Sequence, residues 1–260
     1  MIQTCWEIWG AIIMGNLNEF SLKWRLFLKT YRWRRIDPVP WTPLKKPLAQ
    51  CRLALACSAG FIVPGQQPFD NEIKGGDWSL REIPGDAEAK SLIETHRSEV
   101  FDHAGLHADA NLAFPLDRAR ELVARGRIGS VNRRHISFMG SITAAGRYLR
   151  DSLPQAANWL VEDGVDIALI VPVCPMCNQA SALLAGELER RGITTVVVQL
   201  LREVAEKVRP PRALFVPFKH GYPLDSPSAP VLQHAVIEAA LKMMEDASLT
   251  PPSIVDFVKA

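Results

Sequence analysis

The sequence predicts an α/β fold: three layers, with a mostly parallel, Rossmann- or flavodoxin-like sheet and an N-terminal helical extension. In the second half of the chain, apolar runs at 166–173, 193–200 and 212–218 alternate with helical patterns. Strands that alternate with helices form parallel sheets, because each crossover helix returns the chain to the same end of the sheet. A further apolar run, CRLALACSAG at 51–60, ends in small residues, as a buried strand entering a loop does.

The N-terminal part differs from the rest in pattern. Residues 17–31 place apolar side chains at helical spacing with basic residues between them, which predicts a basic amphipathic helix. We expect its apolar face to pack on the domain or on another subunit, which favours a homo-oligomer. Four prolines within residues 36–47 then predict an extended linker. Residues 1–13 hold a short apolar patch without the features of a secretory leader, and Met14 is an alternative start.

The middle of the chain completes the expected order of elements. Residues 60–114 lack periodicity and are rich in Gly, Pro, Asp and His, which indicates a functional loop region. We divide the chain into an extension at 1–47 and a catalytic domain at 48–260. That domain is either one unit or two lobes, 48–150 and 151–260, with the site between them. The remaining elements expected are a strand at 135–141 and helices at 115–129, 151–164, 175–192, 201–208 and 230–246.

Composition excludes several classes of protein. The chain has 260 residues, of which 48% are hydrophobic and 22% charged, and its net charge is +2. A charge so close to zero gives no basis for nucleic-acid binding, and no apolar stretch is long enough to span a bilayer. The five cysteines are an odd number, which favours a reducing compartment. We therefore expect a cytoplasmic protein.

The stretch LIVPVCPMCNQASALL, residues 169–184, carries the strongest chemical signal. Cys174 directly follows a predicted strand and precedes Pro175, a favoured first residue of a helix. Its sulfur should face a helix N-terminus, at the sheet edge where open parallel sheets bind ligands. Helix N-termini and Cys-x-x-Cys spacing both lower thiol pKa. Cys177 lies within one helical turn, so it is placed to attack a bond formed at Cys174 and release a disulfide.

Two other interpretations of the pair stay open. In the first, the cysteines are small hydrophobic residues in the core. In the second, they bind zinc. A closed zinc site needs four ligands, and no second cysteine pair has suitable spacing. We therefore expect no resident metal; a mixed zinc site would use Cys174 and Cys177 with His103 and His107.

Supporting residues follow from the predicted sheet edge and loops. His220 comes after the strand at 212–218, and His103 lies in the irregular region; either is a candidate acid or base. His107 is a candidate substrate ligand or metal ligand. For each histidine, an ordinary hydrogen-bonded loop residue is about as good an explanation.

Small and amide residues near the same edge are candidates for substrate binding. Ser58 and Gly60 end the first strand, where backbone N–H groups can bind a carboxylate. Asn178 and Gln179 follow in the first turn after the nucleophile and are candidates to hydrogen-bond substrate or to cap the helix.

Longer motifs resemble a known family. The segments FPLDRARELVARG and HISFMGS, and the strand that leads into CPMC, are similar to the selenoprotein B subunits of glycine, sarcosine, betaine and D-proline reductases, nearest the D-proline branch. The resemblance covers roughly residues 33–246. It implies reductive cleavage of a carbon–heteroatom bond. It also implies that Cys174 stands where those proteins carry a nucleophilic selenocysteine, with Cys177 as the resolving thiol.

These observations support several functions. The first is a thiol-dependent enzyme that cleaves a carbon–heteroatom bond of a small carboxylate-bearing molecule. The sequence does not firmly imply a cofactor for this enzyme. An external thiol or a thioredoxin-like protein would reduce it. The second is a desulfurase that releases sulfide from a thiolated heterocycle. A zinc-dependent hydrolase and a non-catalytic binding subunit of a larger complex are further alternatives.

Overall fold

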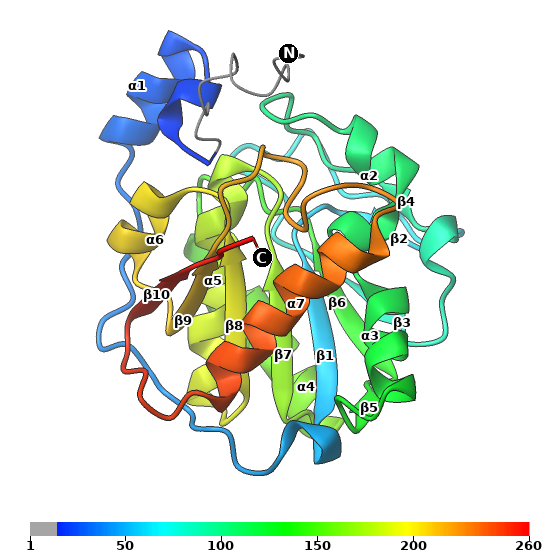
Figure 1. The fold of residues 1–260 in the computed structure, drawn as a ribbon. Coiled ribbons are helices and arrows are strands. Elements are labelled where there is room, and N and C mark those ends of the chain that lie inside the picture. Colours follow the sequence, from blue (N-terminus) through cyan, green and yellow to red (C-terminus); the bar gives the residue numbers. More distant parts are fainter. Residues whose placement is uncertain (1–14, 260) are drawn as a thin grey trace, which may run out of the picture.

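The computed structural model describes residues 15–259, so the expectation for residues 1–13 lies outside the described part (Figure 1). Within it, one sheet has the strand order β10-β9-β8-β7-β1-β6-β3, with β5 paired to β1. The strands are β1 (Arg52–Cys57), β3 (Leu80–Pro84), β5 (Ser130–Val131), β6 (Arg134–Phe138), β7 (Ile167–Val171), β8 (Thr194–Gln199), β9 (Arg212–Phe215) and β10 (Ser253–Asp256).

Helices cover both faces of this sheet, which confirms the three-layer α/β prediction. In Figure 1, α7 and α3 cross the near face, and α5 lies behind β8. Helix α4 packs on α5, and α6 packs on α5 as well. None of the helices described in residues 15–259 is both long and apolar enough to cross a bilayer. The helices are α1 (Leu22–Thr30), α2 (Ala104–Ala108), α3 (Leu116–Ala124), α4 (Leu153–Glu162), α5 (Pro175–Arg190), α6 (Arg202–Val208) and α7 (Pro230–Glu245).

The order of the strands creates a switch point between β1 and β7. From β1 the chain continues to β6 on one side of the sheet, whereas β7, β8, β9 and β10 follow one another on the other side. The pairs β1–β6, β1–β7, β7–β8, β8–β9 and β9–β10 are all parallel. Ligands of open α/β sheets bind where the order reverses, beyond the carboxyl ends of the strands. The loops after β1 and β7 begin at Ser58 and Pro172, so the Cys174 segment lies at this point.

The predicted irregular region contains structure that periodicity did not reveal. Strand β3 pairs antiparallel with β6 at the edge of the sheet. A separate two-stranded ribbon joins β2 (Phe61–Ile62) to β4 (Ile93–Glu94). This ribbon is short, but it draws residues 93–96 back against the end of β1. The expected helix at 151–164 is preceded by a π-helical turn at Tyr148–Ser152, and Pro154 lies in the first turn of α4 as expected.

The N-terminal helix packs on its own chain. Phe20 and Leu28 are buried, whereas Leu22 and Leu26, on the other side of the helix, are exposed. The predicted 17–31 helix is interrupted at Phe20–Ser21, between a short 3-10 turn and α1. Because the face that favoured a homo-oligomer is used within the chain, the homo-oligomer stays a prediction without that support.

Candidate functional site

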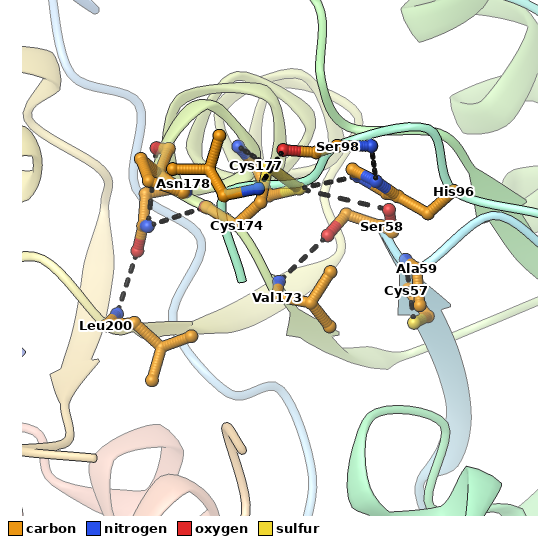
Figure 2. The surroundings of a disulfide bond; sticks show 12 residues. Cys57, Ser58, Ala59, His96, Ser98, Val173, Cys174, Cys177, Asn178 and Leu200 are labelled. Carbon is orange, nitrogen blue, oxygen red and sulfur yellow. Dashed lines mark hydrogen bonds between the residues drawn. A yellow bond between two sulfur atoms is a disulfide. The ribbon is translucent and has the colours of Figure 1, made fainter. Parts of the chain in front are cut away.

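The ends of three strands meet at Ser58. Its backbone N–H donates to the Val171 carbonyl at 3.1 Å, and its hydroxyl accepts from the Val173 N–H at 3.1 Å. Its carbonyl accepts from the Gly140 N–H, which follows β6, at 3.0 Å. The end of β1 thereby holds the segments after β6 and β7 in place. Figure 2 shows the bond between Ser58 and Val173. This arrangement fixes the residues that lead directly to Cys174.

Cys174 caps the N-terminus of α5. Its sulfur accepts from the Cys177 N–H at 3.2 Å, and Pro175 occupies the first turn. The sequence prediction that this sulfur faces a helix N-terminus is confirmed. Cys174 and Cys177 are joined as a disulfide, and they are 1% and 0% exposed. The pair can therefore alternate between a disulfide and two thiols. In this oxidised form, solvent does not reach either sulfur atom.

Gly140, the glycine of the SFMG segment, allows the first turn of α5 to pack closely against the segment after β6. A Cβ there would lie 2.7 Å from Ser58 Cβ and 2.8 Å from Cys177 Sγ. Carbon atoms cannot approach so closely without displacement of the backbone. Gly140 is therefore required for packing beside the disulfide.

We expect Gly140→Ala to destabilise the oxidised protein by about 1–3 kcal/mol, because the added methyl overpacks the site. Urea unfolding measures this change. The matched control is Gly146→Ala, since no atom lies within 4 Å of a Cβ at that position. A loss of stability at Gly146 equal to that at Gly140 would show that steric crowding beside Cys177 is not the cause.

His96 is a site residue that sequence reasoning missed. Its Nε2 lies 3.3 Å from Cys177 Sγ, and its Nδ1 accepts from the Ser98 N–H at 3.0 Å (Figure 2). An imidazole that accepts at Nδ1 carries its proton on Nε2. Burial lowers the pKa of His96 to about 3, with a smaller contribution from His103, so the ring is neutral. His96 thus donates a hydrogen bond to the Cys177 sulfur.

In the sequence, only the composition of the surrounding region pointed to His96 as a site residue. It lies in the irregular region, which holds three of the six histidines, His96, His103 and His107. No spacing rule connects it to Cys177, because 81 residues separate the two in sequence. Only the β2–β4 ribbon brings them into contact.

The predicted histidines His103 and His107 lie beside this site and contact neither cysteine. Both face Glu94: His103 Nδ1 is 2.8 Å from Glu94 Oε2, and His107 Nε2 is 2.9 Å from the same atom. His103 also stacks on Phe101, whose ring packs edge-on against His96. In the alternative of a mixed zinc site, these histidines would share a metal with the cysteines. The described residues instead form two groups, His96 with Cys174 and Cys177, and Glu94 with His103 and His107.

His220 reaches the predicted edge of the sheet. The adjacent Gly221 N–H donates to the Val173 carbonyl at 2.9 Å, which places this loop beside the cysteine segment. The ring of His220 is directed elsewhere, because its Nδ1 lies 3.1 Å from Glu19 Oε2 and it packs edge-on against Phe20. Its buried Nε2 has no hydrogen-bond partner within residues 15–259.

The four predicted substrate-binding positions around the cysteines are occupied by structural hydrogen bonds. The N–H of Ser58 and that of Gly60 both donate to backbone carbonyls, so neither is free for a carboxylate as we expected. Asn178 bonds the Cys174 carbonyl and accepts from the Leu200 N–H. Gln179 accepts from the Arg34 N–H at 2.7 Å. Neither amide caps α5, whose N-cap is Cys174. Asn178 joins the first turn of α5 to the residue after β8, and Gln179 holds the segment after α1.

A cavity of about 610 Å³ opens next to the site. His103 and His220 both line it, together with Lys219 and Phe101. Phe101 lies between this cavity and the ring of His96. The cavity brings two of the predicted histidines to one space that can hold a small molecule, and neither cysteine lines it in the oxidised form.

Comparison with known proteins gives a consistent result. A family model described as glycine/sarcosine/betaine reductase selenoprotein B matches residues 21–172. This region includes Ser58, His96 and Gly140 and ends just before Cys174. No solved structure shows a significant match to the chain.

Three curated relatives illustrate the similarity. D-proline reductase subunit gamma of Acetoanaerobium sticklandii is 30% identical over 80% of this chain and 85% of its own length. Sarcosine reductase complex component B subunit beta of Peptoclostridium acidaminophilum is 28% identical over 80% of this chain and 49% of its own length. Glycine reductase complex component B subunit gamma of Symbiobacterium thermophilum is 28% identical over 89% and 54%. The chain thus spans about half the length of the last two. Together with the matched family model, these similarities show that the chain belongs to the glycine/sarcosine/betaine reductase selenoprotein B family.

Proposed function

We propose that this chain is a component of a reductase in which Cys174 and Cys177 cleave a carbon–heteroatom bond of a small, carboxylate-bearing substrate. The observation that carries the proposal is the position of the redox pair. It lies at the switch point of the sheet, with one sulfur at a helix N-terminus and the other bonded to His96. The family relationship supports reductase chemistry, and no observation favours a desulfurase or a hydrolase.

The proposed reaction consumes the reduced pair. The Cys174 thiolate attacks the substrate carbon, a carbon–sulfur bond forms, and the heteroatom leaves with the bonding electrons. The Cys177 thiolate then attacks the Cys174 sulfur, so that the disulfide forms and the organic group leaves as a carbanion that takes a proton. The substrate gains two electrons, which the two thiols supply. The Nε2–H of His96 stabilises the thiolate of Cys177 before this second step.

Turnover requires an external reductant and an opening of the site. A dithiol, either a small molecule or a thioredoxin-like protein, would return the disulfide to two thiols. Reduction also releases the constraint that holds the two buried sulfurs together. The relatives are named as subunits and components of reductases, so other subunits are expected partners of this chain.

The pH dependence of thiol alkylation tests the proposal without a known substrate. We expect iodoacetamide to modify Cys174 of the reduced protein with a midpoint well below the ~8.5 of a free thiol, since a helix N-terminus stabilises the thiolate. Mass spectrometry locates the modification, and a chelator in parallel samples tests for a bound metal.

Two other cysteines serve as internal controls in the same digest. Burial raises the pKa of Cys51 to about 11 and that of Cys57 to about 12, so both should stay unmodified at neutral pH. A Cys174 that reacts no faster than these two would contradict the proposal and support a non-catalytic binding subunit. Reaction only after chelation would show that the cysteines bind metal.

A further inference from the structure

Glu94, His103 and His107 converge beside the redox pair. Their ligand atoms all lie within 4.8 Å of one another. Glu94 ends strand β4. His103 directly precedes α2, with no capping bond from its side chain, and His107 follows one helical turn later on the same face. The carboxylate of Glu94 is 4% exposed, and His107 is 62% exposed. The group is therefore anchored on the protein side and open toward solvent.

The hydrogen bonds of His103 leave a lone pair aimed at a carboxylate. Its Nε2 lies 2.7 Å from the Ser98 carbonyl oxygen, which can only accept, so Nε2 carries the proton. In the neutral ring, Nδ1 then presents its lone pair to Glu94 at 2.8 Å. Two acceptors repel each other at this distance, and either a proton on Nδ1 or a metal ion bound to both atoms removes the repulsion. A histidine whose other N–H is bonded to a backbone carbonyl is oriented as metal-binding histidines are.

Glu94 is oriented in the same manner. Its Oε1 accepts from the His96 N–H at 3.2 Å, and its other oxygen faces both imidazoles. The backbone on either side is fixed, since Ile93–Glu94 pairs with β2 and Thr95 donates to the Gly60 carbonyl through N–H and hydroxyl. These bonds position the carboxylate before any ligand arrives.

We propose that Glu94, His103 and His107 form a binding site for a divalent transition metal, with Zn²⁺ as the ion that fits them best. Two imidazoles and one carboxylate are the donor set of open zinc centres, in which a further position is left for water or a ligand. His103 also lines the 610 Å³ cavity. Glu94 and His107 line a second cavity, of about 380 Å³, which His103 does not line. The three ligands therefore lie at the boundary of the two cavities, and the open position offers a cation to an anionic small molecule there. The site is separate from the cysteines and stands independently of the proposed reductase chemistry.

Metal analysis of the purified full-length chain tests the site. After incubation with Zn²⁺ and removal of free metal, we expect about one zinc ion per chain, measured by inductively coupled plasma mass spectrometry. His107→Ala and Glu94→Gln should each weaken zinc binding at least about 10-fold, because each removes one of three protein ligands. His107 is the more decisive variant, since its exposed side chain can be removed without loss of the fold.

Two controls distinguish this site from the alternatives. His234→Ala removes a histidine that bonds Glu121 on another part of the fold, and it should leave the zinc content unchanged. Cys174→Ser should also retain zinc, and the cobalt-substituted protein should show no thiolate-to-metal charge-transfer band. Loss of zinc in Cys174→Ser would place the metal on His96 and the cysteines and overturn the proposal. So would a wild-type chain that retains no metal.

Discussion

Cys174→Ser is expected to abolish reductive turnover, by about 10³-fold or more, because the hydroxyl that replaces the thiol is not ionised at neutral pH. Bromopyruvate is a suitable probe, since it carries a carboxylate and an activated carbon–bromine bond. The reduced wild-type protein should convert one equivalent to pyruvate and bromide while Cys174 and Cys177 form their disulfide. Pyruvate release and intact-protein mass measure both products.

Cys177→Ser separates the two steps of the same reaction. This variant should still release bromide but should stop at a covalent adduct on Cys174, because no thiol remains to attack that sulfur. The adduct appears as a mass increase located to the peptide that contains Cys174. If Cys174→Ser and the wild type release pyruvate at equal rates, Cys174 is not the nucleophile.

The largest effect on stability is expected at the buried ion pair between Glu189 and Arg212. The Arg212 guanidinium lies 2.7 Å from Glu189 Oε1. The side chain of Arg212 is 2% exposed and that of Glu189 is 0% exposed. Glu189 also accepts from the Thr195 N–H, and Arg212 stacks on Trp41 and donates to the Thr42 carbonyl. Glu189→Ala leaves the arginine charge buried without a partner. We expect a loss of about 3–5 kcal/mol in the free energy of unfolding.

Guanidinium unfolding measures this loss, and Arg150→Ala is the matched control. Arg150 pairs with Asp151 on the surface, with both side chains exposed, and its removal should change stability by less than about 0.5 kcal/mol. If Glu189→Ala costs no more than Arg150→Ala, the buried pair does not hold residues 41–42 against the end of α5.

The regular strands and helices of the second half could be predicted closely. The apolar runs at 166–173 and 193–200 became β7 and β8, and the helix after Pro175 became α5. Strands β3 and β10 were missed for a physical reason. Both lie at edges of the sheet and are partly exposed, so they lack the apolar runs that mark buried strands.

The sequence by itself determined the position of the cysteine pair, Cys174 and Cys177. A thiol before Pro175, after an apolar strand, must lie at a helix N-terminus because local chain geometry leaves little else. Local signals could not indicate that His96 bonds Cys177, nor that the N–H groups of Ser58 and Gly60 are already used. Those contacts join segments far apart in sequence. They depend on which strands pair and where a loop folds back, and only the packed tertiary structure decides that.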